Sequence, residues 1–220
     1  MTEEQKDQLR QKWKSWLDEI GDELGWLLTG RDFFWRLQKI VQSNKKIQSP
    51  AILHKWIADS YVAKVATGIR KIVGKNESMS LYKLIEGIKN NPDVITREYF
   101  ISQWHDKVTK ELGIDHQTFD KYTEPGGQHV NLEGLARDLQ MLDEDTQLIK
   151  TFTDKWVAHL DKNRETIEMP TFGDLDTALD VVDKVWCKYK ELLTCSAPET
   201  QKPAIPEDWE APLLHPWIVE

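Results

Sequence analysis

Four residues in the second half of the chain have side chains that could do proton-transfer or phosphate chemistry: Asp154, Lys155, His159 and Asp161. Residues four positions apart in a helix lie on nearly the same face, so Lys155 and His159 are expected to project together. Histidine titrates near neutral pH, which makes His159 the first candidate for proton transfer. The alternative is that His159 packs or hydrogen-bonds at a helix interface, and both interpretations stay open at this point.

These residues belong to a segment with a clear helical pattern. Its apolar side chains recur at spacings of three and four, or sums of them, which is typical of one long amphipathic helix. The sequence therefore predicts that residues 132–162 form the longest and most central helix of the fold. The apolar residues are Leu132, Leu135, Leu139, Leu142, Ile149, Phe152, Trp156 and Leu160.

The end of this helix resembles the signature helix of the HEPN (higher eukaryotes and prokaryotes nucleotide-binding) superfamily. Its RNase members carry an Arg, then a polar residue, then a His that often follows Ala and precedes a residue and an Asp. The residues that fit this pattern are Asp154, Lys155, Ala158, His159 and Asp161. Thr153 stands where the Arg is expected.

Other segments, in the order that the family has, are similar to its phage abortive-infection branch. They are Trp56-Ile57 with Tyr61, Ile69-Arg70-Lys71, residues 78–85, residues 96–99, and Asp208-Trp209 with Pro216-Trp217. The resemblance implies a mostly helical bundle that often forms a homodimer. It also implies RNA or a nucleotide as ligand, a role in defence or toxin–antitoxin systems, and an antitoxin or other defence protein as partner.

The resemblance further implies a ribonuclease mechanism that needs no metal and no cofactor. In that mechanism His159 assists proton transfer while a cation stabilises charge on the phosphate. Lys155 is the candidate to replace the missing Arg as a point charge, with Asp154 beside it as a third catalytic candidate. Arg70, Asp161, Lys162 and Arg164 are candidates for RNA or nucleotide binding. The second hypothesis is a non-catalytic interaction module that binds a nucleotide or a partner protein.

The remaining pattern is helical throughout and predicts an all-α fold, which the resemblance implies to be a HEPN-like helical bundle. Asp32 is expected to start a second helix after a break, Arg97 to lie on the surface in a first helical turn, and residues 115–130 to form a loop or small lid. The expected helices are 9–28, 33–41, 50–73, 81–88 capped by Ser80, 96–112, and a last one that starts at Thr171 or Asp174.

Residues 1–195 are predicted to form this helical domain, and residues 196–220 a C-terminal tail. The tail has five prolines and no helical period. Its Trp209 and Trp217 are too apolar for a solvated linker, so the tail is expected to pack on the bundle with both side chains buried. Four further tryptophans, at positions 13, 16, 26 and 35, are expected in the core because they stand at helical spacing among leucines.

Composition limits the class of protein. The net charge is −8, but residues 1–75 carry 14 Lys and Arg against 9 Asp and Glu, which leaves a choice between solvated helix faces, the favoured interpretation, and a basic nucleic-acid surface. No run approaches the ~20 apolar residues of a membrane span, so a cytoplasmic protein without a membrane partner is expected. Cys187 and Cys195 are expected to be two reduced thiols.

Overall fold

The computed structural model describes residues 1–49, 51–104, 111–158 and 168–196, with residues 166, 198, 200–201, 205–206 and 208–214. In these residues the protein is an all-α helical bundle, as predicted, and the described chain has no strand. An isolated bridge pairs Thr96 with His129. Among the described residues, no helix has the length and apolar character to cross a bilayer.

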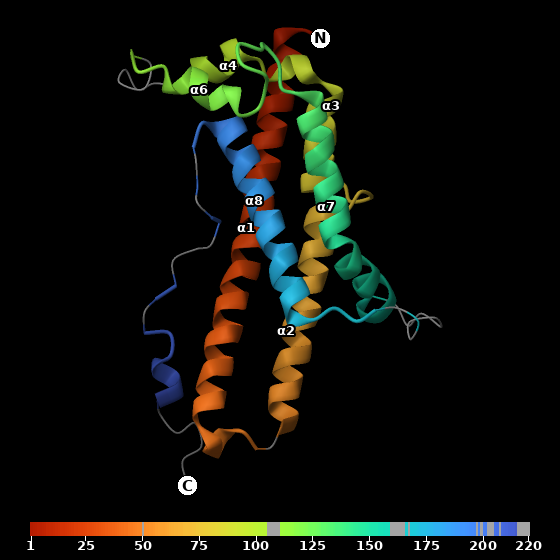
Figure 1. Cartoon of the computed structure of the whole chain (residues 1–220), viewed down its shortest axis with the longest axis vertical. Coiled ribbons are helices and arrows are strands. Elements are labelled where there is room, and N and C mark those ends of the chain that lie inside the picture. Colours follow the sequence, from red (N-terminus) through yellow and green to blue (C-terminus); the bar gives the residue numbers. More distant parts are fainter. Residues whose placement is uncertain are drawn as a thin grey trace.

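Four long helices run side by side along the long axis of the molecule (Figure 1). The first two form an antiparallel hairpin, and the last two form a second antiparallel pair beside it. These helices are α1 (Glu3–Ser43), α2 (Ala51–Val73), α7 (Leu132–Phe152) and α8 (Phe172–Thr194).

Shorter elements gather mainly at the end of the bundle that holds the N-terminus (Figure 1). They are α3 (Leu81–Asn90), α4 (Arg97–Ser102) and α6 (Ile114–Asp120), with the 3-10 turn η2 (Pro92–Val94). Further single turns are η1 (Lys45–Ile47) between α1 and α2, the π turn η3 (Thr153–Val157) after α7, and η5 (Ala211–Leu214) in the tail.

Helix α1 continues through the position where a break was predicted. Thr29 donates its hydroxyl hydrogen to the carbonyl of Gly25 at 2.8 Å, so the hydroxyl is satisfied inside the helix. A single glycine costs a helix only about 1 kcal/mol, and the buried side chains of Leu28 and Phe34 on either side of Gly30 offset that cost. The predicted end near Gly30 and the predicted cap at Asp32 are therefore wrong.

Helix boundaries set by caps were predicted correctly. Ser80 accepts a hydrogen bond from the backbone N–H of Lys83 at 3.1 Å, and Thr171 forms a reciprocal capping box with Asp174. Thr96 caps α4 in the same way. Two predictions for the chain between these caps are wrong. Helix α4 ends at Ser102 and does not continue to residue 112, and the loop expected at residues 115–130 begins with helix α6.

The core lies where α1, α2, α7 and α8 face one another, with α3 closing one end. Trp13 belongs to it, as predicted, and Trp16 and Trp35 pack against it partly buried. Trp26 does not, because 69% of its surface is exposed. Fully buried side chains include Leu17, Leu24, Ile69, Leu84, Phe119, Leu179 and Tyr189.

Two glycines allow the helices to approach closely. A Cβ at Gly21 would lie 2.7 Å from Cζ2 of Trp186, and one at Gly68 would lie 2.6 Å from Cδ1 of Leu27. The Trp186 ring cannot easily move, because its Nε1 donates a hydrogen bond to the carbonyl of Leu17 at 2.9 Å. Contacts below 3 Å require one partner to shift, so a larger residue at Gly21 is unfavourable, and one at Gly68 requires the Leu27 side chain to move.

The described part of the tail contacts the bundle. Thr200 and Gln201 donate hydrogen bonds to Asp183 of α8, at 2.7 and 3.0 Å. Further along, the ring of Trp209 lies 4.7 Å from that of Phe33 on α1. Trp209 is half-buried, which is less than predicted, and Trp217 lies outside the described residues.

Gly21→Ala should lower the free energy of unfolding by about 1–3 kcal/mol, because the added methyl group overpacks the fixed Trp186 ring. Gly30→Ala should instead raise it by about 0.5–1 kcal/mol, since nothing lies within 4 Å of the new Cβ and the helix is continuous there. Urea denaturation of both variants checks this pair. A Gly30→Ala variant less stable than wild type would contradict the continuous helix.

Trp209→Ala should lower the free energy of unfolding by about 1–2 kcal/mol, because half of a large apolar ring loses its contacts. Trp209→Phe should lose less, since it keeps a ring against Phe33 and removes an indole N–H that is buried without a hydrogen-bond partner among the described residues. Thermal unfolding followed by circular dichroism distinguishes them. Equal losses in both variants would show that the ring contact contributes nothing.

Candidate functional site at the end of helix α7

The helix that carries the predicted site changes its geometry just before the site. Helix α7 ends at Phe152, and the backbone N–H of Ala158 donates to the carbonyl of Thr153 at 2.8 Å, five residues back. The prediction of one α-helix over residues 132–162 is therefore wrong at the π turn, and residues 159–162 lie outside the described residues. The prediction that this helix is the longest is also wrong, because α1 has 41 residues and α7 has 21. A π turn holds one residue more than an α turn and is frequent at functional sites.

Several predicted site residues lie beyond this turn. His159, Asp161, Lys162 and Arg164 are outside the described residues, so their roles stay predictions. Lys155 is half-buried in the π turn and has no ion pair with a described residue. The α-helical spacing that was expected to place Lys155 and His159 on one face does not apply within the π turn.

Thr153 occupies the position where the resemblance expects Arg, and it faces the core. Only 1% of its surface is exposed, and its hydroxyl donates to the carbonyl of Ile149 at 2.7 Å. An Arg side chain at this position would start from the core, where a charge without a partner is costly. The position is therefore unsuited to hold a phosphate-binding cation in this fold.

A guanidinium reaches the site from α2 instead. Arg70 donates from Nε to a carboxylate oxygen of Asp154 at 2.5 Å and from Nη1 to Glu77 at 2.8 Å. The prediction that Arg70 converges on this site is thus met at Asp154. The hydrogen bond to Asp154 raises the pKa of Arg70 above its ordinary value. About 39% of the Arg70 side chain and 49% of the Asp154 side chain remain exposed.

A second charged cluster lies beside this pair. Asp143 of α7 accepts hydrogen bonds from Lys150 at 2.5 Å and from Lys75 at 2.9 Å. The two lysines hold the pKa of Asp143 below its ordinary value, Lys150 most strongly. No helical spacing predicts the contact with Lys75, which follows the end of α2, so sequence reasoning missed this cluster.

Both clusters line one open groove of about 320 Å³ between the end of α2 and the second half of α7. Its charged residues are three cations and three carboxylates, so the groove is electrically balanced. Gln147, Thr151 and Asn76 add neutral hydrogen-bonding groups. A charged ligand can therefore bind in the groove only where it competes with an existing ion pair. Its charged residues are Arg70, Lys75, Lys150, Glu77, Asp143 and Asp154.

Other chemistry has little support in the described residues. No group of three or more His, Cys, Asp or Glu side chains among them has an arrangement that could hold a metal ion. Cys187 and Cys195 are free thiols, as predicted. Burial raises the pKa of Cys187 to about 12 and that of Cys195 to about 11, so neither is a thiolate nucleophile at neutral pH.

Arg97 has a structural role that the sequence did not suggest. It was expected on the surface, but only 6% of it is exposed. It donates to the carbonyl of Gly127 at 2.8 Å and to the carboxylate of Asp120 at 2.5 Å. Arg97 therefore ties α6 and the loop that follows it to α4, at the opposite end of α7 from the groove.

No family model, curated protein or solved structure matches this chain. Membership of the HEPN superfamily accordingly stays a prediction from the residues of the signature segment.

Asp143→Asn should lower the free energy of unfolding at pH 7 by up to about 1 kcal/mol, because the Asp143 carboxylate is more than a third exposed. The lowered pKa means that this contribution is present above about pH 4 and is lost as the pH falls further. The difference between wild type and variant should therefore shrink from pH 7 to pH 3 in urea denaturation. Asp145→Asn, exposed on the same helix and without an ion pair to a described residue, is the control. A difference that is constant with pH would contradict the role of Asp143.

Proposed function

We propose that this chain is a HEPN-like interaction module that binds the phosphate of an RNA or nucleotide at the α2–α7 groove without cleaving it. The family part of this proposal rests on the signature residues around Asp154. The resemblance also supports a cytoplasmic homodimer in a defence or toxin–antitoxin system, with an antitoxin or other defence protein as partner.

The observation that carries the proposal is the set of hydrogen bonds that the Arg70 guanidinium makes. Its guanidinium is the group best suited to a phosphate, since it offers several N–H donors in a planar fork. Asp154 and Glu77 already occupy two of these donors. A phosphate can bind by displacing a carboxylate, but the positive charge available to it is reduced.

Cleavage would demand more than binding does. The negative charge that develops on the phosphate oxygens is best stabilised by a fixed cation that no carboxylate already neutralises. Thr153 is buried and offers none, and Arg70 is neutralised by its two partners. This favours binding over catalysis.

A second function, metal-independent RNA cleavage, has one observation in its favour. Arg70 stands at the signature segment, next in space to Asp154, and Lys155 follows Asp154 without an ion pair to any described residue. In this alternative Arg70 and Lys155 together replace the missing Arg, and His159 transfers the proton.

Asp154→Asn should strengthen the binding of a fluorescein-labelled single-stranded RNA about three- to tenfold, because it releases Arg70 from a partly exposed charge contact worth roughly 1 kcal/mol. Arg70→Gln should weaken binding. The control is Asp180→Asn, which breaks the comparable Arg31–Asp180 pair of 2.6 Å on another surface and should change nothing. Fluorescence anisotropy at low salt measures all three. Equal affinities in wild type and Asp154→Asn would contradict the proposal.

Cleavage is tested on the same RNA in EDTA. The proposal expects no cleavage by wild type. Cleavage that is lost in His159→Ala, with the helical circular dichroism retained, would establish the second function in its place.

A further inference from the structure

The α1–α2 hairpin extends past the rest of the bundle. Helix α8 begins at Phe172, whose ring lies 5.1 Å from that of Phe34 on α1 and 6.3 Å from that of Tyr61 on α2. The part of α1 after Phe34 and the part of α2 before Tyr61 therefore project beyond the start of α8, as Figure 1 shows. Residues 36–49 and 51–58 are called the hairpin tip below.

The hairpin tip exposes large apolar side chains. Exposed fractions are 70% for Ile52, 67% for Trp56, 55% for Leu53 and 40% for Ile47. Leu53 was expected on the buried face of α2, and it is exposed because α7 and α8, as far as the structure describes them, do not reach this part of α2. Exposed apolar side chains that lie together commonly mark an interaction surface.

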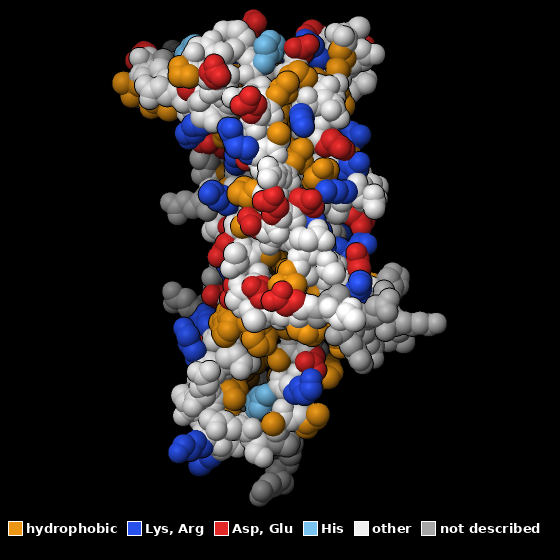
Figure 2. Space-filling model, turned by 45° about the vertical axis from the view of Figure 1, so that its right-hand side comes forward, with side chains coloured by type: hydrophobic (Ala, Val, Ile, Leu, Met, Phe, Trp, Pro, Cys, Tyr) orange, Lys and Arg blue, Asp and Glu red, His pale blue; other side chains and the backbone are white. Residues whose placement is uncertain are grey.

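The same tip is basic in an acidic protein. From Arg36 to Ala58 the sequence holds five Lys and Arg and no Asp or Glu, whereas the whole chain has a net charge of −8. Hydrophobic and basic side chains gather at this end of the molecule in Figure 2. The charge and the exposed apolar side chains thus occupy the same end of the molecule.

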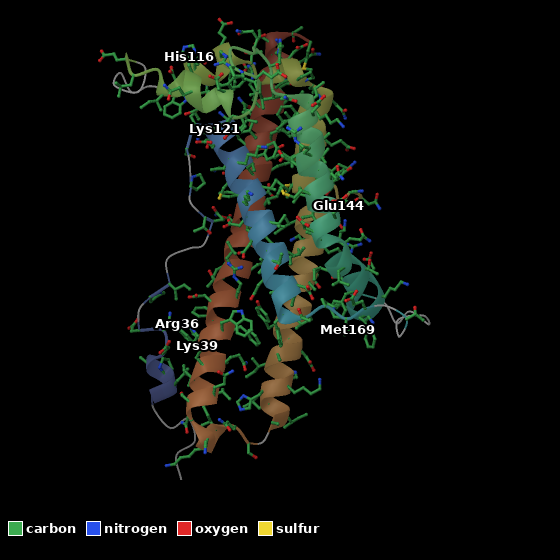
Figure 3. All side chains as sticks on the ribbon, in the orientation of Figure 1. Arg36, Lys39, His116, Lys121, Glu144 and Met169 are labelled. Carbon is green, nitrogen blue, oxygen red and sulfur yellow. The ribbon has the colours of Figure 1, made fainter. Side chains whose placement is uncertain are left out.

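Part of this charge is available to a partner. Arg36 is paired with Glu210 of the tail at 2.9 Å, and it lies with Lys39 on the lower part of α1 (Figure 3). Lys39, Lys45 and Lys46 are exposed and have no ion pair with a described residue. These three cations give the tip its unbalanced positive charge.

The turn that joins the two helices is held in a defined shape. His54 donates from Nε2 to the carbonyl of Ile47 at 2.5 Å, and Asn44 accepts from the backbone N–H of Lys46 at 3.1 Å. Gln48 donates to the carbonyl of Val41 at 3.0 Å. The tip is therefore an ordered, convex projection. Such a shape suits contact with an extended surface rather than the binding of a small ligand in a groove.

We propose that the hairpin tip docks on the surface of a membrane that contains anionic lipid. Trp56, Ile52 and Leu53 enter the headgroup region, where Trp is favoured, and the lysines meet the lipid phosphates. An RNA surface would offer bases to stack on aromatic rings, but three of the four exposed apolar residues are aliphatic. The contact needs no spanning helix, and it is independent of the α2–α7 groove.

Flotation of the full chain with lipid vesicles tests this proposal. Wild type should float with vesicles of phosphatidylglycerol and phosphatidylcholine at low salt, and not with phosphatidylcholine alone. Trp56→Ala and the double variant Lys45→Glu/Lys46→Glu should each reduce the floated fraction at least threefold. Trp26→Ala is the matched control, because Trp26 is exposed to the same degree, 69%, but lies beside Asp22 and Glu23.

Three results would each overturn the proposal. They are flotation of wild type with vesicles of phosphatidylcholine alone, no flotation of wild type with either kind of vesicle, and a loss of flotation in Trp26→Ala equal to that in Trp56→Ala. So would a Trp56→Ala variant that floats like wild type but loses RNA binding or self-association, since the tip would then serve another partner. Asp154→Asn should float like wild type, which keeps this outcome separate from that of the groove. Circular dichroism confirms that each variant is folded.

Discussion

The close approach of α1 to its neighbours is the constraint on which the bundle depends. Gly21 admits the Trp186 ring of α8, and Gly68 of α2 admits Leu27 of α1. Trp186 is fixed in turn by its hydrogen bond to the α1 backbone. Because α1 is unbroken for 41 residues, these two contacts hold one rigid helix against both α2 and α8.

Buried polar contacts then place α7 on that frame. Asp138, only 8% exposed, accepts hydrogen bonds from Lys188 at 2.6 Å and from the hydroxyl of Tyr189 at 2.7 Å, both on α8. A buried carboxylate must keep such partners, so this contact constrains how α7 lies against α8. At the other end of α7, its packing against α2 brings together the two charged clusters of the groove.

The sequence could predict what depends on local chemistry. Caps such as Ser80 and Thr171 act within one turn, and helical periodicity identified the all-α class and most of the helices. The π turn could not be read from the pattern, because it changes the register without a distinctive residue. The exposure of Leu53 and the burial of Arg97 depend on which other elements pack against each residue. Tertiary packing decides this, and local sequence patterns do not report it. At the site, only the approach of Arg70 to the signature segment was anticipated.

The π turn also sets the direction in which the chain leaves α7. Each residue in an α-helix turns the chain by about 100°, and the π turn between Thr153 and Ala158 takes one residue more to complete the same turn. Loss of one residue within it would let an ordinary α-helix reach Ala158 on nearly the same face. A one-residue deletion here should therefore disturb the packing of α7 less than a deletion in the middle of that helix, where no extra residue is present.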